Sequence, residues 1–534
     1  MRSLAALLLV LVASIAQGQE PHVELQATPI WAARAALADA QQLPPEVATR
    51  SRWVWLRSGS QEELAALSFV LNSTLSRVNI AVVPGSSAGA VPLAGGHLVR
   101  LDLGILATDL DDFANLVTTW ELLARRDSDF TARIVERKKV VVPRYRHTDG
   151  KFYTARWENL EIEGPAAHVV AEVTALTALT QSLVPVIDGR ELQATALTTL
   201  QNGIYYNLRG MKIGMGLKEY LASRGASEEQ VTKLESMEKA VILQSKVTGK
   251  ERMVSVFRGA GVRASTGGGI VSLTFDGLDE DRAADDSPIR NLLNFRGRAI
   301  ESLVEVSNGF LEAGLWQDGK LVAAAPPNVA ADHKIPEPHT RNLEGLLSCT
   351  RCHCNSVNLG WQGFTNDAQK ILAAGTDIFG DLSSPDERLK QVQVLAGLYS
   401  GDWFEVGTGP LSVGRLTYNR ASLLATGRSI ADVATLISAT YDAYIYQTLD
   451  VWDVASEIGL VGLPPSDDNP ETKHDEAAAV AVLKVFIGAQ PQEGVVVRED
   501  AVIAAICAGI PVTRNTFNSS KHIIYERAMQ RGLK

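Results

Sequence analysis

Cysteine is rare in this sequence and unevenly placed. Of four cysteines in 534 residues, Cys349, Cys352 and Cys354 fall within six positions, and Cys507 lies far from them. A secreted chain of this length held by disulfides would usually scatter its cysteines, so the clustering indicates chemistry at one site. The segment Cys349-Thr350-Arg351-Cys352-His353 has the C-x-x-C-H spacing that is typical of covalent attachment of a c-type haem.

The chemistry of attachment explains this spacing. Two thiols three positions apart lie on nearly one face of a helical turn, so each can form a thioether with one of the two haem vinyl groups. His353 follows directly and can bind the iron through its neutral imidazole. The sequence therefore predicts one haem c, bound covalently by Cys349 and Cys352, with His353 as the metal ligand.

Two other readings of the cluster stay open. A structural zinc ion could use Cys349 and Cys352 with either His353 or Cys354, but such sites usually take two separated ligand pairs, and no second short-spaced pair is present. The protein would then be a zinc-stabilised structural or interaction protein. A redox-active dithiol is the other reading, although no thioredoxin-like context surrounds it.

The role of Cys354 and the distal iron ligand are also open. Cys354 is not needed for attachment; it could pair with Cys507, or Cys507 could be a small buried apolar residue. Electron-transfer haems often carry a Met or His on the far side of the iron. The candidates for this ligand are His333, His339, His474, His522 and Met529. An open distal side would favour a peroxidase-like haem enzyme instead of a carrier.

The N-terminus predicts export. Residues 1–3 are a short basic region, residues 4–15 are apolar, and the small residues Ala16 and Gly18 follow. This is the layout of a secretory signal peptide over residues 1–18, which places the mature protein in the periplasm or outside the cell. The apolar run is shorter than the roughly 20 residues that span a bilayer, so we expect no stable membrane span after cleavage.

Composition limits the partners. A formal net charge of −10 at pH 7 argues against nucleic acid, which would favour a basic face. A single haem moves one electron, so a periplasmic redox partner protein is expected. We favour electron transfer or haem binding over an enzymatic role.

The element pattern predicts an α+β fold. An N-terminal α/β domain covers residues 19–150, a mixed helical and β region covers 151–330, and a mainly helical haem-bearing region covers 331–534. Apolar residues at helical spacing predict helices over 62–76, 110–126, 166–183, 192–208, 227–245, 413–426 and 430–449. Extended apolar runs predict strands over 78–83, 91–103, 254–257, 270–275 and 321–325.

The segments around the cysteines resemble large exported bacterial proteins of the cytochrome c type that carry a single C-x-x-C-H haem. In that family, a strand pair with an "NG…DG" layout and a following "AP" leads into the haem motif. Similar features stand here at 306–321, 325–329 and 345–353, with one residue more between Gly345 and Cys349. Residues 53–56, 98–103, 453–460 and 497–500 extend the similarity over most of the chain. The resemblance implies haem c on Cys349, Cys352 and His353, and it implies no particular substrate.

Overall fold

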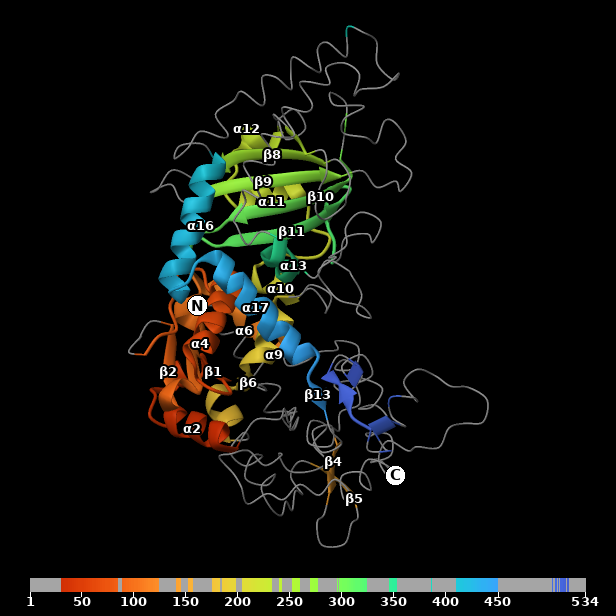
Figure 1. Ribbon diagram of the computed structural model, residues 1–534. Coiled ribbons are helices and arrows are strands. Elements are labelled where there is room, and N and C mark those ends of the chain that lie inside the picture. The colour runs from red at the N-terminus through yellow and green to blue at the C-terminus, as the bar shows by residue number, and fades with distance from the viewer. Residues whose placement is uncertain are drawn as a thin grey trace. The chain divides into compact units, whose positions relative to one another are not determined.

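The computed structural model (Figure 1) contains helices together with antiparallel and mixed sheets, which confirms the predicted α+β class. It describes residues 30–84, 89–123, 141–145, 152–156, 175–182, 185–197, 204–232, 240–242, 252–259, 269–276, 295, 297–323, 345–352, 386, 410–449, 502, 505–506, 508, 510–514 and 516–517. The chain forms two compact units that interleave along the sequence. Unit 1 is Met1–Leu64, Val82–Ala194 and Ala439–Lys534, and unit 2 is Ala65–Ala81 and Thr195–Ser438.

Unit 1 is built on a four-stranded mixed sheet with strand order β2-β3-β1-β6. β1 pairs antiparallel with β3, with Trp53 opposite Arg100, and parallel with β6, with Trp53 opposite Val186. The strands are β1 (Ser51–Trp55), β2 (Ala90–Leu93), β3 (Leu98–Asp102) and β6 (Val186–Asp188).

Helix α2 (Ile30–Ala40) packs on this sheet through a stripe of alanines. Ala32, Ala36 and Ala40 recur every fourth residue, so they lie on one face of the helix and pack in one core with Trp53. Asp39, in the last turn, accepts a hydrogen bond from Trp53 Nε1 at 3.0 Å and pairs with Arg100 at 2.7 Å. The helix is thus held by apolar burial and by a carboxylate that reaches two strands.

Unit 1 has further strands and helices outside the four-stranded sheet. β4 (Val141–Tyr145) pairs with β5 (Phe152–Arg156), and β13 (Thr448–Leu449) pairs with β14 (Val512–Thr513). Its helices are α3 (Pro45–Ala48), the 3-10 turn η2 (Ala94–Gly96), α5 (Leu103–Leu106) and α6 (Leu110–Leu123). Three further helices contain a boundary between the units: α4 (Gln61–Val70), α9 (Gly189–Ala196) and α17 (Ile430–Ile445).

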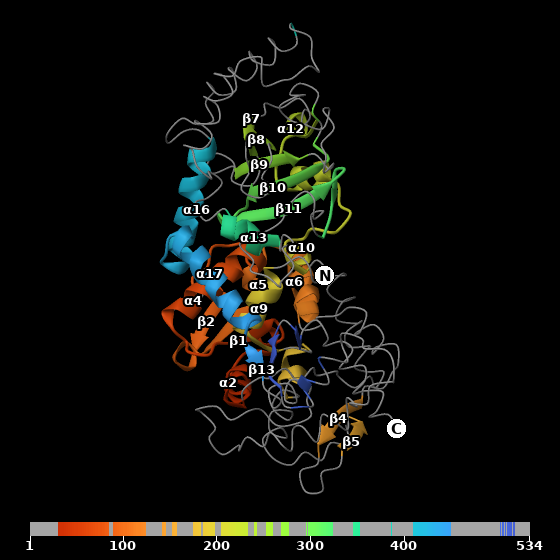
Figure 2. The ribbon, with the colours of Figure 1, turned by 45° about the vertical axis from the view of Figure 1, so that its right-hand side comes forward.

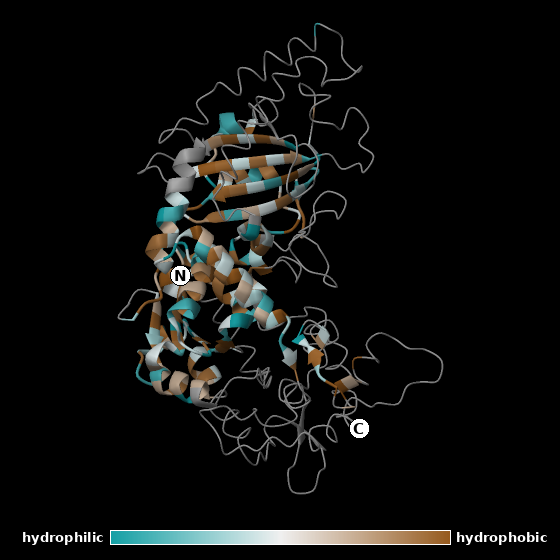
Figure 3. Cartoon of the chain, in the orientation of Figure 1, coloured by the Kyte–Doolittle hydropathy of each residue, from teal (hydrophilic) through white to brown (hydrophobic). Residues whose placement is uncertain are grey.

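Unit 2 is built on a six-stranded antiparallel sheet whose strands follow one another in the chain, with order β12-β11-β10-β9-β8-β7. Central strands β10 and β11 are buried along almost their whole length, so both faces of the sheet are covered. Hydrophobic positions run along these strands and are interrupted by hydrophilic ones (Figure 3). The strands are β7 (Ala240–Ile242), β8 (Arg252–Gly259), β9 (Gly269–Asp276), β10 (Ala299–Glu305), β11 (Leu311–Gln317) and β12 (Lys320–Leu321).

Helices cover this sheet from several segments of unit 2. α13 (Gly345–Cys352) contacts β11, and α16 (Pro410–Thr426) contacts β8 and β9 (Figure 2). α10 (Ile204–Leu208) contacts the π-helical turn η1 (Leu71–Leu75). α11 (Leu217–Ser223) and α12 (Glu228–Thr232) complete the unit's described helices. No helix within the described ranges is long and apolar enough to span a membrane.

The predicted helix over 62–76 is present, but its last turn is widened. α4 continues as η1, where Ser76 N donates to Leu71 O, five residues back, at 2.7 Å. Asn72, in this turn, donates to Ile80 O and accepts from Ile80 N, at 2.7 and 3.0 Å. This side chain takes the hydrogen bonds that a neighbouring strand would make. The prediction of a strand over 78–83 is therefore wrong.

Other predictions need correction as well. The strand expected over 321–325 is wrong after Leu321, where β12 (Lys320–Leu321) ends. The strand expected over 91–103 is a hairpin, because Gly95 and Gly96 take φ of 68° and 97° in the turn between β2 and β3. The helix expected over 227–245 is wrong at its end, where the apolar residues Ala240–Ile242 pair with β8 as an edge strand. The predicted helices over 110–126 and 413–426 correspond to α6 and α16, and the strands over 254–257 and 270–275 lie within β8 and β9.

Candidate functional site

The predicted haem motif begins on α13. Cys349 and Cys352 both lie on this helix, three residues apart, which places them on neighbouring positions of one face. Near the start of the helix, Leu347 N donates to Leu197 O at 3.0 Å, which satisfies a backbone donor that the helix itself leaves open. Of the predicted site residues, the structure describes the side chain of Cys349 and only the backbone of Cys352. His353 lies outside the described residues, as do Cys354 and Cys507.

Cys349 is buried, with 6% of its surface exposed. Its Sγ donates a hydrogen bond to Oε1 of Glu301, on β10, at 3.6 Å. A thiol is a weak donor and a carboxylate is a strong acceptor, so the two groups form a thiol–carboxylate hydrogen bond. The sulfur that the sequence singles out therefore faces a buried acidic group.

Glu301 is itself part of an ionic chain across three strands. Arg252, on β8, places Nη2 3.3 Å from Glu301 Oε2 and 2.7 Å from Asp276 Oδ2, on β9. Burial lowers the pKa of Arg252, but Asp276 and then Glu301 raise it, and the net pKa lies above its usual value. Arg252 therefore stays charged and holds both carboxylates.

Strand register explains why these groups meet. Ala299, on β10, lies opposite Asp276, on β9. Glu301 lies two residues further along β10, so the side chains of Glu301 and Asp276 face the same side of the sheet. Residues 252 and 276 occupy the next paired position after Met253 and Phe275. The chain from Asp276 through Arg252 and Glu301 to Cys349 thus lies on one face of the sheet.

Two tyrosines of α10 cap the edge of β11 near this point. Ala313 N donates to the Tyr205 hydroxyl at 2.8 Å, and Leu315 N donates to the Tyr206 hydroxyl at 3.2 Å. Burial is the main cause of the raised pKa of both phenols, and for Tyr205 the negative charge of Glu312 adds to it. The two tyrosines therefore stay neutral and serve as acceptors for strand backbone that has no strand partner there.

The two residues between the cysteines are also buried. Thr350 is 3% exposed and Arg351 is 7% exposed. Arg351 Nε donates to Ser438 Oγ at 3.3 Å. The Thr350 hydroxyl has no hydrogen-bond partner among the residues that the structure describes. α13 is thus enclosed on all sides up to Arg351, although several of its residues are polar.

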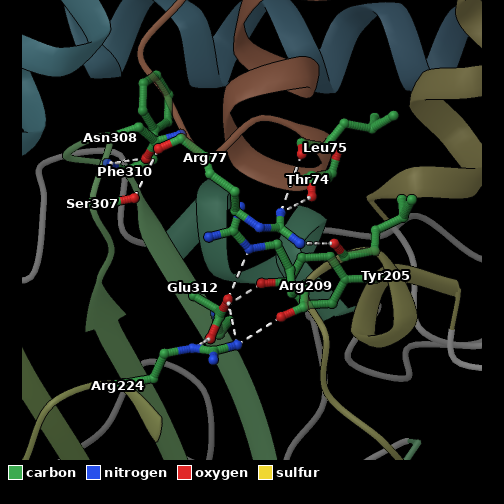
Figure 4. Close-up of polar contacts among 12 residues, drawn as sticks. Thr74, Leu75, Arg77, Tyr205, Arg209, Arg224, Ser307, Asn308, Phe310 and Glu312 are labelled. Carbon is green, nitrogen blue, oxygen red and sulfur yellow. Dashed lines mark hydrogen bonds and ion pairs between the residues drawn. The ribbon is translucent and has the colours of Figure 1, made fainter. Parts of the chain in front are cut away.

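A second buried ionic cluster lies on the opposite face of the sheet. Glu312, on β11, pairs opposite Val304, whereas Glu301 pairs opposite Leu315, so the two glutamates face different sides. Arg209 Nε lies 2.7 Å from Glu312 Oε2, and Arg224 Nε lies 2.7 Å from Glu312 Oε1 (Figure 4). The Tyr220 hydroxyl donates to Glu312 Oε1 at 2.8 Å. The carboxylate is enclosed by donors, which suits a structural role.

The electrostatics of this second cluster follow from those contacts. Burial raises the pKa of Glu312, but Arg224 and Arg209 lower it more, to about 2. Figure 4 shows the Glu312 carboxylate between the two guanidinium groups. The glutamate is therefore ionised at every physiological pH.

Sequence reasoning identified Cys349 but missed Glu301 and Arg252. A signal was present, because each is a charged residue within a strand that is otherwise largely apolar, and a buried charge requires a partner. Within the described ranges, no cluster of three or more His, Cys, Asp or Glu side chains could hold a metal ion. Comparison with known proteins gave no match to any family model, curated protein or solved structure.

Proposed function

We propose that this chain is an exported protein that carries one c-type haem and transfers electrons. Cys349 and Cys352 form the thioethers, and His353 binds the iron. The observation that carries the proposal is the C-x-x-C-H sequence, whose first four residues lie on helix α13.

The donor set suits this group. Two cysteines three residues apart on a helix match the two vinyl groups of one haem. The Thr350 hydroxyl, between them, is buried and has no hydrogen-bond partner in the described ranges. A buried hydroxyl without a partner lowers the stability of the fold by about 1–3 kcal/mol. A bound group or an ordered water that supplies the partner is the usual explanation for such a hydroxyl.

Attachment changes one contact. A thioether has no S–H, so Glu301 Oε1 loses the hydrogen bond that Cys349 donates. Arg252 remains beside the other carboxylate oxygen, so Glu301 keeps a charged partner. A bound haem supplies a one-electron iron centre, and the chain's own residues hold it, bury its attachment point and place charge beside it.

The proposal extends to the location and partners of the protein. The signal peptide over residues 1–18 directs export, and haem c is attached outside the cytoplasm. A periplasmic redox protein exchanges the electron. The haem-bearing C-terminal portion is mainly helical, and α13, α16 and α17 are its described helices.

The test is covalent haem on a denaturing gel. The wild-type protein is expressed with a haem c maturation system and stained for haem after denaturation, and Cys349→Ala and Cys352→Ala are compared with it. We expect the stain in wild type, a weaker stain in each single variant and none in the double variant. Cys507→Ala is the matched control, because it removes a cysteine outside the motif and should keep the full stain.

Two results would each overturn the proposal. Wild-type protein without haem, made by cells whose maturation system loads a known c-type cytochrome, contradicts it. Stoichiometric zinc in that haem-free protein would support the structural alternative. Haem staining that survives in the Cys349→Ala/Cys352→Ala protein would also contradict the assignment.

A further inference from the structure

Glu301 brings a negative charge to the attachment point. Its Oε1 lies 3.6 Å from Cys349 Sγ, the atom that would be bonded to the edge of the haem. Glu301 is 8% exposed and Cys349 is 6% exposed, so water screens this pair poorly. A thioether sulfur carries no charge, so the Glu301 carboxylate would be the charged group beside the attachment point.

We propose that Glu301 sets the reduction potential of the haem by stabilising the ferric iron. This inference rests on the proposed function. Oxidised iron carries one more positive charge than reduced iron, and a nearby buried carboxylate favours the more positive state. Charge, burial and hydrogen bonding beside the cofactor are the means by which proteins tune haem potentials.

Arg252 and Asp276 keep this carboxylate in place. Asp276 accepts from Arg252 Nε through both oxygens at 2.9 Å, and Nη2 of the same arginine lies 3.3 Å from Glu301. Arg252 is thus shared between two carboxylates, and its charge offsets only part of theirs. The three strands fix all three side chains, so the Glu301 carboxylate is held between Arg252 and Cys349 of α13.

Glu312, another buried carboxylate of the same sheet, does not place an unbalanced negative charge near Cys349. Glu312 faces the opposite side of the sheet and is enclosed by Arg209, Arg224 and Tyr220. Two guanidinium groups therefore outnumber its single negative charge. Glu301 is the better candidate for an effect at Cys349.

The experiment is a potentiometric titration of the holoprotein. Glu301→Gln removes the charge and keeps the shape of the side chain. We expect a more positive midpoint potential, by about 59 mV or more, which corresponds to a tenfold change in the one-electron equilibrium. The matched control is Asp318→Asn, which removes a charge from an exposed ion pair with Arg298 on a turn of the same sheet. This control should leave the potential unchanged.

The outcomes separate the two proposals. Wild-type protein without covalent haem defeats the proposed function itself. Haem-loaded Glu301→Gln protein with the wild-type potential, or an equal shift in Asp318→Asn, defeats only the role of Glu301. If Glu301→Gln does not fold, Glu301→Asp draws the carboxylate back by one methylene and should give a smaller positive shift. An unchanged potential in folded, haem-loaded Glu301→Asp would then overturn the inference.

Discussion

Glu312 illustrates how unit 2 tolerates charge in its interior. A carboxylate and two guanidinium groups are removed from water together, and each glutamate oxygen receives a short charged hydrogen bond. Such a cluster adds little stability over an apolar core of the same shape, but removing one partner leaves the others buried without compensation. The cluster is therefore sensitive to single substitutions.

Replacing Glu312 tests this directly. We expect Glu312→Gln to lower the free energy of unfolding by about 3–5 kcal/mol, because Arg209 and Arg224 keep their charges and lose their counterion. Urea denaturation followed by circular dichroism measures the change. Glu219→Gln is the control, since Glu219 is exposed on α11 next to Tyr220, and we expect a change within about 0.5 kcal/mol. Equal effects of the two substitutions would contradict the structural role of Glu312.

The same residue predicts an acid dependence. The pKa of Glu312 is lowered from its ordinary value of 4.5 to about 2 in the folded protein. A depressed carboxylate pKa contributes stability that is complete above 4.5 and is lost as the pH falls towards 2. The difference in unfolding free energy between wild type and Glu312→Gln should therefore narrow over this interval. A difference that stays constant down to pH 2 would show that the ion pairs do not cause it.

Local spacing explains why one site residue could be predicted and another could not. Cys349 belongs to a pattern complete within five residues, and the chemistry of that pattern is independent of the fold. Glu301 and Arg252 come from two different strands and meet each other because the sheet register aligns them, and Glu301 then contacts Cys349. A charged residue in an apolar strand predicts that a partner exists, but it does not identify the partner.

At the scale of elements, the β10–β11 turn is joined to the π-helical turn η1. Asn308 Nδ2 donates to Asn72 O at 2.7 Å and to Ser76 O at 2.9 Å, while its Oδ1 accepts from Phe310 N at 3.1 Å. Figure 4 shows Asn308 and Ser307 beside Arg77. The widened turn opens the carbonyls that this side chain needs, since a π-turn disturbs regular helical bonding. One asparagine thereby links two segments that are far apart in the sequence.

Asn308→Ala should therefore weaken the packing of two elements at once. We expect a loss of about 2–4 kcal/mol, because buried carbonyls of η1 and the amide of Phe310 each lose a partner. Thermal unfolding of the full chain measures this loss. Ser307→Ala, at the neighbouring exposed position, removes one hydrogen bond to Arg77 O and should cost less than about 1 kcal/mol. A cost for Asn308→Ala no larger than that for Ser307→Ala would refute the link.

Hydrophobic periodicity predicted helices and strands correctly where the sequence pattern of a segment agrees with its packing in the fold. α6 and α16 carry long apolar periods and were expected. Residues 78–83 alternate as a strand would, yet the Asn72 side chain supplies the hydrogen bonds of a strand partner. The hydrophobic pattern of residues 78–83 cannot show that a side chain, and not a strand, binds their backbone.

At the scale of the whole molecule, the compact units are assembled from distant stretches of chain. The predicted domains are contiguous, over 19–150, 151–330 and 331–534, whereas unit 1 consists of three separate segments of the chain and unit 2 of two. In unit 1, β1 pairs in parallel with β6, and such a pairing can span many residues. Composition and loop signals cannot reveal a strand pairing between distant segments, because they describe residues that are close together in the sequence.

The proposed export concerns the whole chain, and the intact mass of the mature protein tests it. We expect the mature protein to begin at Gln17 or Gln19, after cleavage behind Ala16 or Gly18. Leu8→Arg places a charge within the apolar segment, so the variant should keep its N-terminus and lack haem. Intact-mass spectrometry of both proteins gives the answer. Haem on unprocessed Leu8→Arg protein retained in the cytoplasm would contradict the link between export and attachment.

The most direct test of haem attachment uses Arg351, which stands between the two cysteines. Trypsin cleaves after Arg351, so digestion separates peptide 342–351, with Cys349, from peptide 352–370, with Cys352. If both thioethers form, mass spectrometry of the denatured digest will find one haem joining these two peptides. The same two peptides recovered without haem, from protein produced with a working maturation system, would contradict the account.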